Sequence, residues 1–92
     1  MSGFYLEMVR DTIADLAPQP GGWVSLRRLR AALPAVPRET MDAVLREIDR
    51  HYGVIAPEDN QKVLTDADRA AAIRIGGQDK HLVALTRAGN DQ

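Results

Sequence analysis

Apolar residues recur at helical spacing near the start of the chain, which predicts a first helix over residues 4–16. We expect Ser2 to cap its N-terminus and Pro18 to end it. One face of this helix carries an apolar stripe that we expect to lie in the core: Leu6, Val9, Ile13, Leu16 and Ala17. Phe4 and Met8 point roughly away from this stripe. Two interpretations are open, a partner surface or a fold-back of Phe4 over the helix start.

Two more helical patterns, over residues 26–33 and 38–51, flank the proline-rich turn "PAVP". Ser25 is a suitable N-cap for the first helix, and Pro37 is expected at the first position of the second. The apolar positions of these helices and of the turn predict a buried set: Leu26, Leu29, Leu33, Val36, Met41, Val44, Leu45, Ile48 and Tyr52. Gly53 is expected to stop the second of these helices in the left-handed conformation.

Short β-type runs occupy the rest of the chain. Trp23–Val24 is expected to form a very short strand or a staple, and Val54–Ile55 is expected to begin a strand. The runs "AAIRI" (71–75) and "HLVAL" (81–85) are expected to pair as a hairpin, because the connection "GGQDK" begins with glycine.

One further helix is expected before this hairpin. Thr65 and Asp68 have the spacing of a capping box, with Asp in place of Glu, which predicts a short helix over residues 66–71. The polar residues 87–92 are expected to form a frayed tail, so the ordered part of the chain would be residues 4–86.

The composition agrees with one small domain spanning residues 1–92. Hydrophobic residues make up 45% of the chain and charged residues 27%, which is ordinary for a globular protein. There is no cysteine, which excludes disulfides and thiolate zinc ligands. No apolar run is long enough to span a membrane, and the start "MSGFYLEMVRD" lacks the features of a secretory signal. We therefore expect a cytoplasmic protein, and the excess of arginine over lysine favours a GC-rich bacterial genome.

The order of elements resembles that of a winged helix-turn-helix domain over residues 4–86. The part most similar to this family is "VSLRRLRAAL…ETMDAVLREIDRHYGVI", with its capped helix, its turn and its leucine-striped third helix. The resemblance implies an α+β fold of three helices with a C-terminal β-hairpin, called the wing, and here an extra short helix before it. The chain departs from the family at residues 57–71, because the family's wing follows the third helix directly.

The resemblance implies that the third helix enters the DNA major groove while the hairpin contacts the backbone or minor groove. Arg46 and Arg50 lie opposite the buried stripe and would contact bases, and Ala43 would permit close approach. Other cations of the second helix and the hairpin would contact phosphates. The predicted DNA-binding set is Arg27, Arg28, Arg30, Arg38, Thr40, Arg46, Arg50, Arg74 and Lys80.

This hypothesis also predicts an oligomer. One small module covers little DNA, so a transcriptional regulator of this kind would bind double-stranded DNA as a homodimer. The natural dimer contacts are Phe4, Tyr5 and Met8.

The charge distribution supports a competing hypothesis. The formal net charge is −1; residues 23–38 carry +4 and residues 69–90 carry +3, but residues 39–50 carry −2 and residues 57–68 carry −3. An acidic third helix is a poor approach surface for a polyanion, and its arginines would form ordinary surface ion pairs. A protein–protein interaction module, such as an adaptor, inhibitor or assembly subunit, is therefore the alternative. A continuous basic face would favour DNA binding, and interruption by acids would favour the alternative.

Catalysis has little support in the sequence. His51 and His81 are the only histidines, and with Glu58 and Asp79 they show no spacing typical of a metal site. The glycines of "IGG" at 75–77 lack the GK[ST] ending and the following helix of a phosphate loop. We therefore expect no catalytic residue, no metal and no cofactor.

Overall fold

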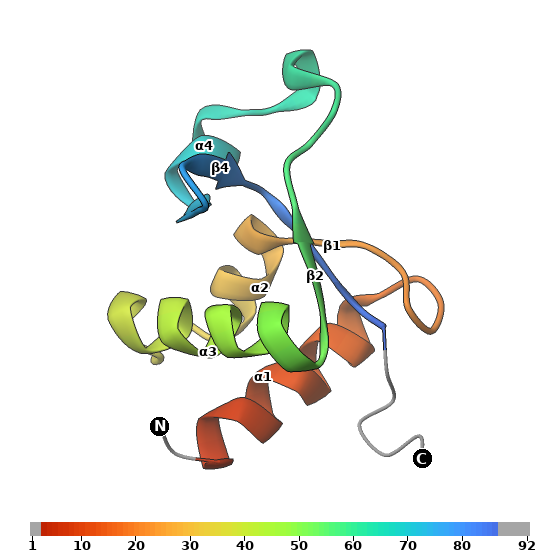
Figure 1. Ribbon diagram of the computed structural model, residues 1–92, viewed down its shortest axis with the longest axis vertical. Helices are drawn as coiled ribbons and strands as arrows, with labels where there is room; N and C mark the ends of the chain where they lie inside the picture. The colour runs from red at the N-terminus through yellow and green to blue at the C-terminus, as the bar shows by residue number, and fades with distance from the viewer. Residues whose placement is uncertain (1–2, 87–92) are drawn as a thin grey trace.

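Residues 3–86 are described by a computed structural model, in which helices and short strands are interspersed along the chain (Figure 1). The helices are α1 (Gly3–Leu16), α2 (Leu26–Ala32), α3 (Arg38–His51) and α4 (Asp66–Ala70), with a 3-10 turn, η1, at Gln61–Val63. The strands are β1 (Val24–Ser25), β2 (Gly53–Ala56), β3 (Ile73–Ile75), β4 (Gln78–Lys80) and β5 (Leu82–Leu85). The chain is therefore an α+β domain, as predicted. Ser2 and the tail 87–92, for which we predicted a cap and fraying, lie outside the described residues.

The helix boundaries follow the local capping signals. α1 begins one residue before its predicted start, and α2 and α4 end one residue before their predicted ends. The Ser25 hydroxyl oxygen caps α2 by accepting a hydrogen bond from the Arg28 backbone N–H at 3.1 Å. Thr65 and Asp68 form both halves of the predicted capping box on α4. These signals are reliable because each joins residues only three positions apart.

Two predictions at the ends of α3 are wrong. Pro37 is the N-cap of α3 rather than its first residue, because its ψ of 150° is extended. Gly53 is not left-handed, since positive φ within residues 3–86 is confined to other glycines. Gly53 instead opens β2, where a Cβ atom would overlap the carbonyl oxygen of Ala84. Glycine is required there for the close approach of β2 to β5, and not for a turn.

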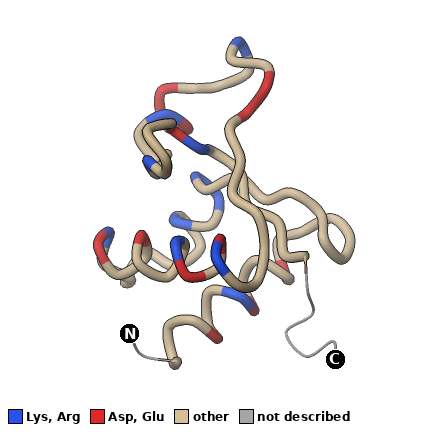
Figure 2. Tube along the Cα trace, in the orientation of Figure 1, with Lys and Arg blue, Asp and Glu red and all other residues tan. Residues whose placement is uncertain are grey.

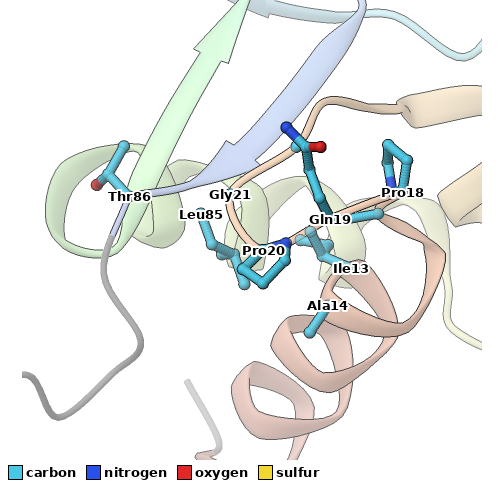
Figure 3. Close-up of a pocket in the computed structure, with 10 residues that line it drawn as sticks. Ile13, Ala14, Pro18, Gln19, Pro20, Gly21, Leu85 and Thr86 are labelled. Atoms are coloured by element: carbon cyan, nitrogen blue, oxygen red, sulfur yellow. The ribbon is translucent and has the colours of Figure 1, made fainter.

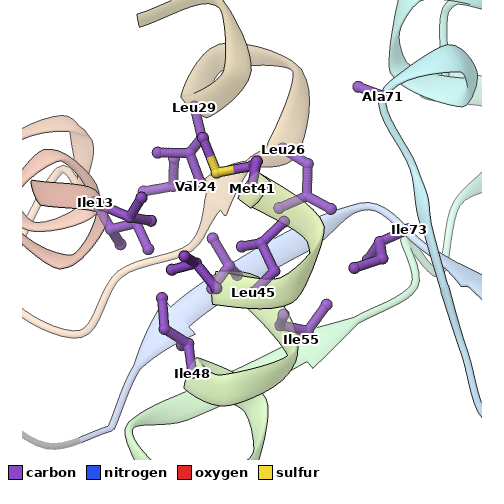
Figure 4. Close-up of a cluster of buried hydrophobic side chains, with 13 residues drawn as sticks. Ile13, Val24, Leu26, Leu29, Met41, Leu45, Ile48, Ile55, Ala71 and Ile73 are labelled. Carbon is purple, nitrogen blue, oxygen red and sulfur yellow. The ribbon is translucent and has the colours of Figure 1, made fainter. Parts of the chain in front are cut away.

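The apolar stripes meet in one core between the helices and the sheet. Figure 4 shows side chains of α2, α3 and the strands pointing toward one another. The buried cluster is Val9, Ile13, Val24, Leu26, Leu29, Met41, Val44, Leu45, Ile48, Ile55, Ala71, Ile73 and Val83. The remaining predicted core residues are half-buried against it: Leu6, Leu16, Ala17, Leu33, Val36 and Tyr52. The predicted core faces of α1, α2 and α3 are therefore confirmed.

β5 is the central strand of a three-stranded antiparallel sheet in the order β1-β5-β2. Val83 of β5 lies between Val24 of β1 and Ile55 of β2. Because side chains opposite one another lie on one face, these three residues share the inner face, on which the helices pack. Residues 82–85 therefore belong to the main sheet.

The predicted pairing of "AAIRI" with "HLVAL" is wrong. β3 pairs instead with β4, and Ile75 lies opposite Gln78. Gly76 and Gly77 have φ values of 64° and 78°, which a two-residue hairpin turn requires and which most other residues rarely adopt. The tight turn places residues 78–80, rather than 81–85, opposite β3, so β5 is available to the main sheet.

Residues 57–81 leave the main sheet after β2 and return to it at β5. We call this segment, which contains η1, α4 and the β3–β4 hairpin, the excursion; it forms the upper part of Figure 1. Two hydrogen bonds close its base. The His81 backbone N–H donates to the Ala56 carbonyl at 2.9 Å, and the Glu58 backbone N–H donates to His81 Nδ1 at 3.1 Å.

Candidate nucleic-acid interface

The outer face of α3, which would enter the major groove, carries balanced charge. Arg46 and Arg50 are exposed, and Glu39 and Glu47 share this side of the helix. Arg50 Nη2 donates to Glu47 Oε1 at 2.9 Å. Figure 2 shows basic and acidic positions alternating along the helix. The face therefore offers little net attraction to a phosphate backbone.

Arginines of α3 are directed toward the excursion. Arg46 Nη2 donates to the carbonyl of Arg74 at 3.1 Å. Arg38 donates from Nη1 to the Ala70 carbonyl at 2.8 Å and from Nη2 to the Ala72 carbonyl at 2.7 Å. One flank of α3 is thus joined to the end of α4 and the start of β3.

Arg30 of α2 makes the most buried of these contacts. Its Nε donates to the Ala71 carbonyl at 2.8 Å, and its Nη2 donates to Asp42 Oδ1 at 2.7 Å. Only 15% of the Arg30 side chain is exposed, and Asp42 also lies 3.6 Å from Arg38. We call Arg30, Arg38 and Arg46 the arginine clamp. The guanidinium groups of Arg30 and Arg38 satisfy carbonyls at and just after the C-terminal end of α4, where a cation is stabilising, and Arg46 binds a carbonyl of β3.

Arg27 is also bound to the excursion. Its Nε donates to Asp68 Oδ1 at 2.8 Å. Hydrogen bonding from the Thr65 backbone, followed by that from Arg27, lowers the pKa of Asp68 to about 2. Asp68 is therefore ionised under physiological conditions, and its charge offsets that of Arg27 where DNA would approach.

Arg74 is bound within its own hairpin. Its Nη1 donates to Asp79 Oδ1 at 3.1 Å, and its Nη2 donates to the Gly77 carbonyl at 2.8 Å. The side chain is 67% exposed, so this ion pair is a surface pair of small energetic value.

Three members of the predicted DNA-binding set have no side-chain partner within residues 3–86: Arg28, Thr40 and Lys80. Arg28 is exposed, whereas Thr40 and Lys80 are half-buried. They belong to α2, α3 and β4 respectively. Acidic groups thus lie among the predicted DNA-binding cations. The residues without a side-chain partner are spread over three elements and form no continuous basic face.

The predicted dimer residues differ in exposure. Phe4 is 67% exposed and meets the Tyr5 ring edge-on, at 5.5 Å between centroids. Tyr5 and Met8 are half-buried, and Tyr5 packs against the core. Phe4 is therefore the part of this set that offers most surface to a partner.

Trp23, which was predicted to lie in a short strand and was given no functional role, lies outside β1, which begins at Val24, and is 49% exposed. It directly precedes Val24, which faces the core with 1% exposure. Because side chains alternate along a strand, this spacing could have predicted an outward tryptophan.

Two features of the described residues offer little chemistry. A groove of about 600 Å³ lies between the end of α1, the loop at 18–22 and the end of β5 (Figure 3), and no titratable side chain lines it. His81 is 7% exposed, and its Nδ1 accepts a hydrogen bond from a backbone N–H.

Within residues 3–86, no three His, Asp or Glu side chains are grouped as a metal site requires. None of the described helices is both long and apolar enough to cross a membrane.

Comparison with protein-family models, curated proteins and solved structures finds no match to this chain.

Proposed function

We propose that the chain is a winged-helix-type domain that works as a protein–protein interaction module. The connectivity supports the fold assignment: β1 lies between α1 and α2, a tight turn joins α2 to α3, and β2 and β5 form an antiparallel pair. In this assignment the excursion takes the place of the wing tip. The arginine clamp then holds an enlarged wing against α2 and α3.

One observation carries the proposal for protein binding. Of the eight predicted DNA-binding cations, six use their side chains to hydrogen-bond a carboxylate or a backbone carbonyl of the same molecule: Arg27, Arg30, Arg38, Arg46, Arg50 and Arg74. Phosphate binding would require many of these contacts to be exchanged, and phosphate neutralisation supplies most nonspecific DNA affinity. By contrast, large apolar side chains are exposed, with Phe4 at 67%, Val63 at 56% and Trp23 at 49%. Exposed apolar groups of this size are typical of protein contacts.

DNA binding is the second candidate, because α2 holds no acid and Arg28 has no side-chain partner within residues 3–86. Arg28, together with Lys80 of β4, would then provide phosphate contacts. A regulator of this kind would use the homodimer discussed below.

Fluorescence anisotropy of a labelled mixed-sequence DNA duplex, titrated with the full chain from low to physiological salt, separates the two candidates. A protein-interaction module gives no saturable binding even at low salt. Saturable binding that weakens steeply with salt would contradict it and support the DNA candidate. In that case the double variant Arg28→Ala, Lys80→Ala should reduce the salt slope by about 2, about 1 for each phosphate contact. Lys62→Ala, on η1, is the control variant.

A further inference from the structure

The main sheet has one covered face and one open face. Val24, Ile55 and Val83 share the inner face and are each at most 2% exposed. The helices that contact the sheet, α1, α2 and α3, contribute to the same core as these three residues. The outer face is formed by the alternate residues of the same strands.

Apolar side chains line the outer face. The register places Val54 opposite Ala84 and Ala56 opposite Leu82. Val54 is 43% exposed, and Trp23, which directly precedes β1, is 49% exposed. Trp23 and Val54 are thus exposed, Ala56 and Leu82 are half-buried, and Ala84 is 5% exposed, whereas the residues of the inner face are at most 2% exposed.

A hollow of about 460 Å³ lies on this face, lined by Trp23, Ala56, Pro57, Glu58, Asp59 and Leu82. We call it the Trp23 hollow. It lies where β2 leads into the excursion, so the main sheet and the excursion both contribute to it. Within residues 3–86, no hydrogen-bond acceptor is bound to the Trp23 indole N–H, so that donor is available to a ligand.

The rim of the Trp23 hollow is acidic. Neither Glu58 nor Asp59 lies within ion-pair distance of a basic side chain in residues 3–86. Glu58 Oε2 accepts a hydrogen bond from the Asn60 backbone N–H at 3.1 Å, which orients its carboxylate. The other acids of the excursion differ, because Asp66, Asp68 and Asp79 each face an arginine. Two carboxylates are thus left for a cation from outside.

The β2 edge of the sheet is not suited to strand addition. The Ile55 backbone N–H points away from β5 and donates to Asp49 Oδ1 at 3.0 Å. A carboxylate at an edge strand blocks the approach of another backbone. At this edge a partner would therefore dock through its side chains onto the open face.

We propose that the Trp23 hollow binds a segment of a partner protein that presents an arginine or lysine next to a large aliphatic residue. The cation stacks on the exposed indole and pairs with Glu58 and Asp59. The aliphatic residue covers Ala56 and Leu82. This inference rests on the proposed protein-binding function and supplies its surface and the chemistry of its partner.

The test uses a synthetic peptide of alternating leucine and arginine, with a second peptide in which citrulline replaces each arginine. Citrulline keeps the shape of arginine and removes the charge. Trp23 is the only tryptophan of the chain and the peptides contain none, so its emission reports this site directly. The arginine peptide should change the Trp23 emission saturably, and the citrulline peptide should bind about tenfold more weakly or worse.

Charge-matched variants locate the site. The double variant Glu58→Gln, Asp59→Asn should weaken binding of the arginine peptide about tenfold, and less at high salt. The double variant Asp11→Asn, Asp15→Asn removes the same charge from exposed positions of α1 and should leave the affinity unchanged. Trp23→Ala, followed by anisotropy of a labelled peptide, should also lose about tenfold. Circular dichroism confirms that this variant is folded, as expected for an exposed position.

Three results would overturn the proposal: equal binding of the citrulline peptide, equal losses from the two charge-matched variants, or peptide binding that leaves the Trp23 emission unchanged. Failure of both peptides to bind would overturn it as well. None of these results affects the DNA titration above, so failure of the surface and failure of the protein-binding function can be distinguished.

Discussion

Asp68 is the residue whose charge contributes most clearly to local structure. Its Oδ2 accepts hydrogen bonds from the Thr65 backbone N–H at 3.0 Å and from the Thr65 hydroxyl at 2.9 Å, while Oδ1 accepts from Arg27. The Thr65 hydroxyl oxygen in turn accepts from the Asp68 backbone N–H at 3.0 Å. All of the bonds to the carboxylate favour its ionised form, which accounts for the low pKa.

This pKa predicts a pH-dependent contribution to stability. Because the pKa of Asp68 is lower in the folded chain than its ordinary value of 3.8, the ionised carboxylate stabilises the fold above pH 3.8, and this contribution is lost as the pH falls toward about 2. Asp68→Asn should therefore melt at a lower temperature than the parent chain at neutral pH, and the difference should shrink between about pH 4 and pH 2. Thermal melts across this range measure it. Asp59→Asn, at an exposed position, is the control, and a difference for Asp68→Asn that does not change with pH would contradict the prediction.

The two sets of contacts at Asp68 differ in how far the sequence predicts them. Thr65 and Asp68 are three positions apart, and their spacing alone predicts the capping box. Arg27 is 41 positions away from Asp68, and nothing local links it to that carboxylate. The same holds for Arg30 and Ala71. These arginines were predicted to bind DNA because, without the tertiary fold, an arginine paired inside the molecule cannot be told from an exposed one.

At the scale of elements, α4 depends on tertiary contacts. It has five residues, and isolated helices shorter than about 12 residues are marginal in water. Within the described residues no α4 side chain is buried, so packing of an apolar face contributes little. Its C-terminal carbonyls are bound by Arg30 and Arg38 instead. The arginine clamp is therefore what holds α4, and with it the excursion, against α2 and α3.

Removing the clamp should loosen the excursion before the core. Arg30→Ala should lower the free energy of unfolding by about 2 kcal/mol, because a charged donor with little exposure is lost and Asp42 loses its closest partner. Arg38→Ala, at a more exposed position, should cost about 0.5–1 kcal/mol. Urea denaturation measures both, and hydrogen exchange should show faster exchange of amides in residues 66–80.

Arg28→Ala is the matched control for this experiment. It lies on the same helix as Arg30, and within residues 3–86 its side chain has no partner. Its effect should remain within about 0.5 kcal/mol. If Arg28→Ala were as costly as Arg30→Ala, the loss of any arginine from α2, rather than of the clamp contacts, would account for the effect, since alanine is itself a strong helix former.

The strand pairing could not be predicted from the local sequence of the strands. The runs at 71–75 and 81–85 both have β-type composition, and their separation suits a hairpin. Gly76 and Gly77 instead form a two-residue turn, which is shorter than the predicted connection. Residues 78–80, whose polar composition is typical of a loop, therefore form the second strand of the hairpin. β5 then pairs with β1, more than fifty positions earlier in the chain, and composition carries no signal for that contact. Apolar periodicity, by contrast, predicts the helices and the core because each helix buries its own stripe.

At the scale of the whole molecule, apolar and acidic surfaces lie side by side. On α1, Phe4 shares its exposed side with Asp11 and Asp15. On the main sheet, Trp23 lies beside Glu58 and Asp59. If a second copy of the chain packs on the α1 surface, acids of one copy approach acids of the other. If a basic segment binds the Trp23 hollow, it neutralises the acids there. Salt should therefore affect the two associations in opposite directions.

We predict that the chain forms a homodimer through the N-terminal half of α1 and that salt strengthens it. A two-fold contact would place Phe4 and Met8 of each copy against those of the other, since residues four apart share a helix face. Asp11 would then approach its counterpart, and screening over about 10 Å at 0.1 M salt would relieve the repulsion. Sedimentation velocity at low and high salt measures the effect.

Two variants decide whether this surface is responsible. Phe4→Glu should give a monomer at every salt concentration, because it replaces the most exposed apolar side chain of α1 by another acid. Val63→Glu, which changes an apolar side chain of similar exposure on η1, should leave the dimer intact. A dimer that weakens with salt, or that is lost equally in both variants, would show that α1 does not form the contact. Since salt should weaken docking at the Trp23 hollow, a single salt series with the two probes separates self-association from partner binding.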